Sequence, residues 1–184
     1  MAQPMSGAMT LANFDALPED NSVRYELQDG VVVMSARPNR PHQRALHRLI
    51  SRIEDRLPAG WEVLGEFEVL VLDGSPATVR VPDIVVTRTT GNENRADAAD
   101  VALAVEIISP GSRNIDLHLK PFEYGEAGIP QYWVVDLDPP APSITVFTLD
   151  GEGYREQPAV AGELRATLEL DGPVDLVIDV AALV

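Results

Sequence analysis

One acidic residue stands inside a strongly apolar run and is the first candidate for chemistry. Glu106 lies within residues 101–108, where the other seven residues are apolar. The run predicts a strand buried on both faces, in which an ionised side chain is costly unless it is paired or binds a cation. Asp83 opens another apolar strand, and we expect the two carboxylates to lie side by side. Two acids in a dry cleft favour a divalent-metal site.

Both acids also have a purely structural interpretation. Glu106 could be one half of a buried ion pair with an arginine. Asp83 follows Pro82 at a strand start, where aspartates commonly cap turns. The wholly apolar flanks of Glu106 favour a site role for this residue, because buried charged groups cluster at functional sites.

The elements that must position these acids follow a mixed order. A short helix is expected from Thr10 to Leu17, and Asp29-Gly30 predicts a hairpin between strands at 24–27 and 31–36. The pattern predicts an α/β fold with a central mixed β-sheet flanked by helices, in a single domain of residues 10–184 after a disordered segment 1–9. The remaining expected elements are a helix from Pro41 to before Pro58, strands at 61–72, 78–86, 101–108 and 131–136, a helix ending near Ala127, and hairpins at 143–157 and 166–180.

The predicted helix after Pro41 carries arginines at every fourth position. Arg44, Arg48 and Arg52 share one face, while the leucines and isoleucines occupy a separate arc. Such a face is usually solvated and paired with nearby acids, but it is also suited to contacts with phosphates. His42 falls within the apolar arc, so its side chain is expected to point inward.

Composition excludes several classes of protein. The 184 residues include no cysteine, which excludes disulfides, zinc–thiolate sites and cysteine nucleophiles. No apolar run approaches the length of a membrane span and the first twenty residues lack the features of a signal peptide, so we expect a cytoplasmic protein. The net charge of -15 argues against a generic nucleic-acid binder, because basic residues provide most non-specific affinity for phosphates.

Four phrases in this order resemble the Uma-two family of restriction endonucleases, within the PD-(D/E)XK superfamily. They are Arg24-Tyr25-Glu26-Leu27-Gln28-Asp29-Gly30, Val81-Pro82-Asp83, Val105-Glu106-Ile107-Ile108-Ser109-Pro110-Gly111-Ser112 and the run from Ala127 to Asp136. The resemblance extends from Thr10 to the C-terminus. It implies a restriction-endonuclease-like core with β-hairpins at both ends.

The resemblance also implies a set of site residues. Asp83, Glu106 and Glu26 would bind Mg²⁺ or Mn²⁺ together with the carbonyl of Ile107. We expect the three carboxylates to converge on one cation and to raise at least one pKa among them.

The lysine departs from the superfamily pattern. The usual position is Ile108, so the resemblance implies that Lys120, on the following helix, is the catalytic cation. Asp116, Lys120 and Tyr124 share one helix face, and Pro121 requires that the helix begin or kink near Lys120. His42 and Tyr124 are expected as accessory residues.

The expected function is therefore a Mg²⁺-dependent endonuclease that hydrolyses phosphodiester bonds, with DNA as the expected substrate. One alternative is a catalytically silent scaffold that binds nucleic acid or protein, which the isoleucine at position 108 favours. A carboxylate-pair hydrolase acting on sugars would need no metal. The C-terminal hairpin offers a surface for self-association as a homodimer or higher homo-oligomer.

Overall fold

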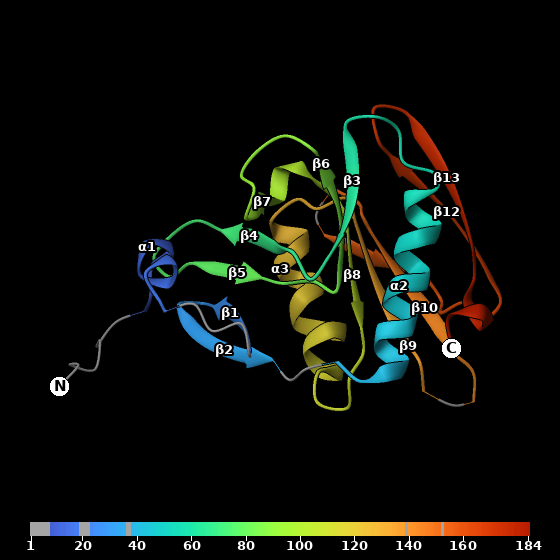
Figure 1. The fold of residues 1–184 in the computed structure, drawn as a ribbon, viewed down its shortest axis with the longest axis horizontal. Helices are drawn as coiled ribbons and strands as arrows, with labels where there is room; N and C mark the ends of the chain where they lie inside the picture. The colour runs from blue at the N-terminus through green and yellow to red at the C-terminus, as the bar shows by residue number, and fades with distance from the viewer. Residues whose placement is uncertain (1–7, 19–22, 36–37, 139, 152) are drawn as a thin grey trace.

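The protein is built on a six-stranded and a five-stranded β-sheet, together with helices and a two-stranded C-terminal hairpin (Figure 1). A computed structural model describes residues 8–18, 23–35, 38–138, 140–151 and 153–184. Residues 1–7 of the expected disordered segment lie outside these ranges. Within the described part of the chain, no helix is long and apolar enough to cross a membrane.

The larger sheet has six strands in the order β11-β10-β9-β8-β6-β3. Only the central neighbours β8 and β9 are parallel, so the sheet is mixed, as the sequence predicts. Every residue of β8 is buried, which agrees with a strand covered on both faces. The strands are β3 (Trp61–Gly65), β6 (Ile84–Arg88), β8 (Val101–Ile107), β9 (Gln131–Asp136), β10 (Ser143–Leu149) and β11 (Tyr154–Glu156).

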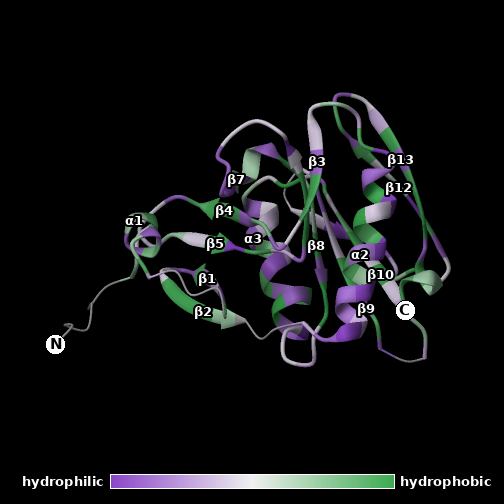
Figure 2. Ribbon diagram, in the orientation of Figure 1, coloured by the Kyte–Doolittle hydropathy of each residue, from purple (hydrophilic) through white to green (hydrophobic). Residues whose placement is uncertain are grey.

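The smaller sheet has five strands in the order β2-β1-β5-β4-β7. Its first hairpin turns at Asp29 and Gly30, which both have positive φ, so the Asp-Gly signal is confirmed. The edge strand β2 is strongly hydrophobic (Figure 2). The strands are β1 (Arg24–Gln28), β2 (Val31–Ser35), β4 (Glu68–Leu72), β5 (Thr78–Arg80) and β7 (Arg95–Asp97).

Two predicted strands are each divided between the two sheets. The run 61–72 breaks at Glu66, whose φ is +53°, into β3 and β4. The run 78–86 breaks at Val81-Pro82-Asp83 into β5 and β6, because Pro82 has no N–H to donate to a neighbouring strand. The prediction of one continuous strand in each run was therefore wrong. The second break places Asp83 directly before β6.

The helices largely agree with the sequence pattern. Thr10 caps α1 (Leu11–Asp15), and Asn39 caps α2 (Arg40–Glu54). Purple and green residues alternate along α2 in Figure 2, as expected for a helix with one apolar face. The helix α3 (Lys120–Glu126) follows a π-helical turn, η2 (Ile115–Leu119). Short 3₁₀ turns, η1 (Ala98–Asp100) and η3 (Val180–Leu183), complete the set.

Both faces of the larger sheet are covered. One face packs on α2 and on the C-terminal hairpin of β12 (Glu163–Glu169) and β13 (Pro173–Asp179). The other face packs on α3 and β4. The hairpin thus buries its leucines within the chain, and self-association through it stays a prediction.

The disorder expected for residues 8 and 9 was wrong. Met9 donates its N–H to the carbonyl of Gly30, 2.9 Å away, and accepts from the N–H of Ala77. These bonds hold the segment against the turn of the first hairpin, because buried main-chain groups seek partners.

Candidate functional site

The pairing of β6 with β8 places Asp83 beside Glu106. Ile84 faces Val105 in this antiparallel pair, so Asp83, which directly precedes Ile84, lies next to Glu106, which directly follows Val105. Both are almost wholly buried, with exposed fractions of 2% and 3%. The N–H of Ile107 donates to Asp83 Oδ2 over 2.8 Å, which fixes the Asp83 carboxylate against the end of β8.

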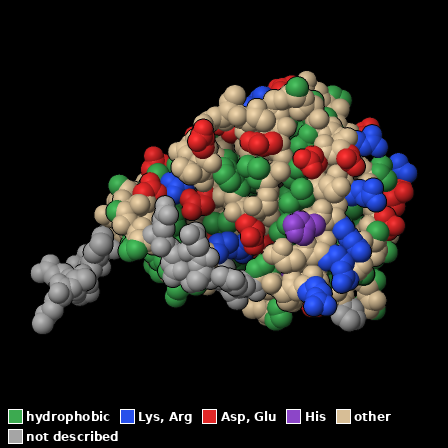
Figure 3. All heavy atoms as spheres, viewed as in Figure 1, with side chains coloured by type: hydrophobic (Ala, Val, Ile, Leu, Met, Phe, Trp, Pro, Cys, Tyr) green, Lys and Arg blue, Asp and Glu red, His purple; other side chains and the backbone are tan. Residues whose placement is uncertain are grey.

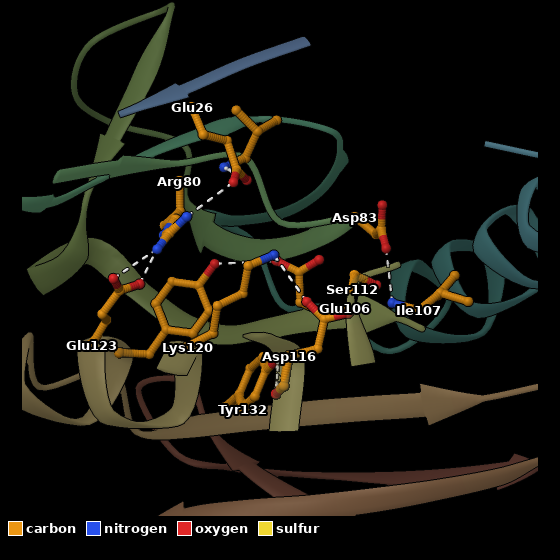
Figure 4. Close-up of polar contacts among 12 residues, drawn as sticks. Glu26, Arg80, Asp83, Glu106, Ile107, Ser112, Asp116, Lys120, Glu123 and Tyr132 are labelled. Carbon is orange, nitrogen blue, oxygen red and sulfur yellow. Dashed lines mark hydrogen bonds and ion pairs between the residues drawn. The ribbon is translucent and has the colours of Figure 1, made fainter. Parts of the chain in front are cut away.

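Lys120 forms an ion pair with Glu106 (Figure 4). Its Nζ lies 2.7 Å from Glu106 Oε1 and 3.2 Å from Asp116 Oδ1. The hydroxyl of Tyr124 donates to the same Glu106 oxygen over 3.3 Å. Lys120 is the only lysine of the chain and is 5% exposed, so its ammonium group is buried inside this cluster.

Local helix structure explains how Lys120 reaches the sheet. Pro121 has no N–H for an i→i−4 bond, and its ring would clash in a regular helix. The wider π-helical turn precedes it, and α3 begins at Lys120. The expectation that the helix starts or kinks at this position is confirmed, and π-helical turns of this kind are frequent at functional sites.

Asp83 is surrounded by donors. His42 Nε2 lies 3.0 Å from Asp83 Oδ2, and Arg24 Nη1 lies 3.3 Å from Oδ1. Burial alone would raise the pKa of Asp83, but His42, the N–H of Ile107 and Arg24 hold it below its ordinary value. His42 points inward from the start of α2, as its position in the apolar arc predicted.

Glu26 lies in a separate ion pair on the first hairpin. Its Oε2 accepts from Arg80 Nη1 over 3.1 Å, and its Oε1 accepts from the N–H of Val81 over 3.0 Å. Arg80 is 1% exposed and also makes two bonds of 2.7 Å to Glu123 on α3. Burial alone would raise the pKa of Glu26, but Lys120, Arg80 and the Val81 N–H lower it below its ordinary value.

Glu106 is the carboxylate with the opposite shift. Burial, followed by the charges of Asp83, Asp116 and Glu26, raises the pKa of Glu106 to about 8, although Lys120 acts in the other direction. Lys120 itself has a raised pKa: burial would lower it, but Glu106, Glu26 and Asp116 outweigh that effect. The expectation of one raised pKa among the three acids thus agrees with the site.

The structure does not join the three acids into one metal cage. Among the described residues, no group of three or more His, Cys, Asp and Glu side chains is placed to hold a metal ion. The reason is that Glu26 is drawn to Arg80 and the Val81 N–H, whereas Asp83 and Glu106 meet at the end of β8. Glu26 therefore lies in a neighbouring pair.

Asp83 and Glu106 still fit a magnesium ion. Mg²⁺ keeps several waters and is commonly bound by one or two carboxylates together with substrate phosphates. Both side chains offer hard oxygen donors where the start of β6 lies beside the end of β8. The metal-ligand roles of Asp83, Glu106, Glu26 and the Ile107 carbonyl stay predictions.

The arginines of α2 form an exposed face of the molecule. Arg44, Arg48 and Arg52 are exposed, and Figure 3 shows basic side chains in a line over the region of α2. Arg48 donates to the carbonyl of Ala182 over 2.6 Å and to that of Val184, so its guanidinium already has protein partners. Contact of this face with phosphates stays a prediction, carried mainly by Arg44 and Arg52.

Three charged residues of the cluster escaped the sequence analysis as site residues: Arg24, Arg80 and Asp116. Arg80 carried a usable signal, because it lies in the apolar run 78–86 just as Glu106 lies in its own run. Asp116 was visible only as the i−4 neighbour of Lys120. No local pattern marks Arg24, whose contact with Asp83 joins residues 59 positions apart.

Comparison with known proteins agrees with this architecture. The sequence matches the family Uma2, described as "Putative restriction endonuclease", over residues 11–181, and the chain belongs to this family. The crystal structure of a putative nuclease belonging to DUF820 from Anabaena variabilis has a TM-score of 0.62 and 18% sequence identity, and the match covers 80% of this chain and 83% of that chain. The likeness shows a shared nuclease-like α/β fold. No curated protein matches the sequence.

Proposed function

We propose that this protein is a nuclease that hydrolyses phosphodiester bonds of nucleic acid, with DNA as the substrate and Mg²⁺ or Mn²⁺ as the cofactor. The observation that supports this most strongly is the buried Glu106 beside Asp83, with the only lysine of the chain 2.7 Å from Glu106. Family membership supports the same class of reaction.

Asp83 and Glu106 would hold the cation, which would supply charge neutralisation at the phosphate and a more acidic attacking water. The residues of the chain have separate tasks. Lys120 keeps its ammonium charged between carboxylates, where it can stabilise the developing negative charge of the phosphate. His42 and the Ile107 N–H hold the Asp83 carboxylate in a fixed orientation.

The test is a cleavage assay on supercoiled plasmid, single-stranded DNA and RNA, with Mg²⁺, Mn²⁺ or EDTA. Asp83→Asn, Glu106→Gln and Lys120→Met are each expected to lower the rate by about 100-fold or more, because each removes a charge at the reacting phosphate. Glu126→Gln removes an exposed carboxylate from α3 and is the matched control, with an unchanged rate. Cleavage that persists in EDTA and in all three variants would refute the proposal.

The arginine face has its own test. Changing Arg44 and Arg52 to Gln is expected to weaken DNA binding and to reduce the salt dependence by about one unit per lost phosphate contact. Arg165→Gln removes an exposed arginine from the C-terminal hairpin and serves as the control. A salt dependence that is unchanged in the α2 variants would assign this face to solvent or to another partner.

A second candidate is a silent scaffold that binds nucleic acid or protein without cutting. The observation in its favour is that Ile108 occupies the usual lysine position and packs beside the core at the α3 face. In that case DNA binding would be measurable by fluorescence anisotropy, without cleavage under either metal, and Lys120→Met would leave binding unchanged.

A further inference from the structure

Asp116 lies closest to the lone lysine after Glu106 and has no assigned role in the proposed reaction. It belongs to the π-helical turn before α3 and is 1% exposed. Its Oδ1 lies 3.2 Å from Lys120 Nζ, four residues along the chain. Figure 4 shows the side chains of Asp116, Lys120 and Glu106 close together.

The backbone of Asp116 is held at both of its polar groups. Its N–H donates to the carbonyl of Ser112 over 2.9 Å, and its carbonyl accepts from the hydroxyl of Tyr132 over 2.8 Å. Tyr132 is itself fully buried. The carboxylate of Asp116 is therefore presented to the site from a fixed position.

One oxygen of the Asp116 carboxylate accepts no hydrogen bond from the described residues. Within the described residues, Asp116 Oδ1 is buried and accepts no hydrogen bond, since the approach of Lys120 at 3.2 Å is an ion pair without hydrogen-bond geometry. Lys120 instead makes its short contact with Glu106 at 2.7 Å. A buried carboxylate oxygen without a hydrogen bond is costly, so it calls for a functional explanation.

We propose that Asp116 is a positioning residue that takes over the Lys120 ammonium when a divalent cation takes the Glu106 carboxylate. This rests on the proposed metal site. A cation at Glu106 and the Lys120 ammonium compete for the same negative charge and repel each other. The unused acceptor of Asp116 gives the ammonium a second partner within the cluster, so that Lys120 stays charged and in place beside the phosphate.

The test is a double-mutant cycle on metal affinity, measured by calorimetry with Mg²⁺ and with Mn²⁺ alone. Asp116→Asn is expected to weaken binding by about tenfold or more in the wild-type background, the range found when an outer partner of a metal ligand is removed. In the Lys120→Met background the same change is expected to have an effect of less than about twofold, since no ammonium remains to be moved. Glu126→Gln controls for the loss of one negative charge on α3.

Each alternative outcome has a distinct meaning. Equal losses in both backgrounds would show that Asp116 acts directly on the ion by its charge, and no loss in either would show that it has no role; both outcomes overturn the inference and leave the proposed nuclease intact. Absence of Mg²⁺ and Mn²⁺ binding by the wild-type protein would overturn the metal site and this inference together.

A second measurement needs no variant and covers the case in which Asp116→Asn does not fold. Because Lys120 is the only lysine, a sample labelled with carbon-13 and nitrogen-15 at lysine gives one side-chain signal. On addition of Mg²⁺ this signal is expected to shift and to keep the relaxation of an ordered group. A change to the relaxation of a freely rotating lysine would show that Asp116 does not retain the ammonium.

Discussion

Replacing Glu106 by glutamine is expected to change how stability depends on pH. Burial and the neighbouring carboxylates raise the pKa of Glu106 from 4.5 to about 8. Between these values the folded protein holds a proton that the unfolded chain releases, so stability falls as pH rises through this window. Each pH unit within this window costs about 1.4 kcal/mol, so Glu106 alone lowers the free energy of unfolding by about 4 kcal/mol by pH 8.

The measurement is urea unfolding in metal-free buffer at pH 5, 6.5 and 8, followed by circular dichroism. Glu106→Gln removes the titrating group, so the free energy of unfolding is expected to fall less steeply over this range than in the wild-type protein, by about one proton in slope. The slopes are compared instead of the absolute values, because glutamine also loses the ion pair with Lys120. Glu126→Gln, from the exposed side of α3, is expected to keep the wild-type slope.

Equal slopes in the wild-type protein and in Glu106→Gln would refute this reasoning. That result would mean that Lys120 holds Glu106 ionised in the folded state at neutral pH, so that the charge of the adjacent ammonium outweighs burial and the three nearby carboxylates. A changed urea dependence, seen as a different m-value, would instead indicate an altered unfolded or native state.

Three further outcomes follow from the same contacts. Arg80→Met is expected to lower the free energy of unfolding by about 3–5 kcal/mol, because it leaves Glu26 charged and buried, and Glu26→Gln in that background is expected to restore part of the loss in urea unfolding. The ionised Asp83 carboxylate stabilises the fold at pH values above 3.8, its ordinary pKa, and this stabilisation is lost as the carboxylate is protonated in acid. The difference in the free energy of unfolding between the wild-type protein and Asp83→Asn is therefore expected to be smaller at pH 3 than at pH 7. Gly30→Ala is expected to cost about 1–3 kcal/mol, more than Gly128→Ala, because Gly30 has φ +74° and a Cβ there would lie 2.6 Å from a main-chain nitrogen, whereas at Gly128 no atom lies within 4 Å.

The elements that could be predicted are those with strong local signals. The period of apolar residues and the proline in its first turn, Pro41, define α2, and the Asp29-Gly30 pair defines the first hairpin. The buried strand around Glu106 was equally clear, because seven apolar residues surround one acid. In each case the signal lies within a few residues, so the sequence contains it in full.

The division of strands between two sheets could not be predicted from the same pattern. A strand that leaves one sheet and enters another keeps its apolar residues throughout, as the run 61–72 does. The break at Glu66 depends on a positive φ at a residue that rarely adopts it. Pro82 did carry a signal, since proline interrupts the bonds of a central strand.

The partners of the site carboxylates could be predicted only in part. Lys120 could be predicted as a site residue because it is the one lysine on the helix after Glu106. The inward position of His42 could be predicted because it lies in the apolar arc of α2. Arg80 and Arg24 join Glu26 and Asp83 across 54 and 59 positions of the chain, and such pairs depend on how the two sheets pack. These long-range pairs explain why the three acids, which were expected to surround one metal ion, each pair with a different basic side chain.

The charge of the buried cluster connects the raised pKa of Glu106 with the proposed cation. Among the described residues, the buried carboxylates in the cluster are Glu26, Asp83, Glu106 and Asp116, and the buried cationic side chains beside them are Arg80 and Lys120. The half-buried Arg24 and Glu123 add one charge of each sign. Four negative charges against two positive charges leave an excess of two. A proton on Glu106 removes one of them, and a divalent cation at Asp83 and Glu106 would remove both. Proton and cation are thus alternative ways to neutralise one site, and a protein of net charge -15 would accept a phosphate there more readily with the cation in place.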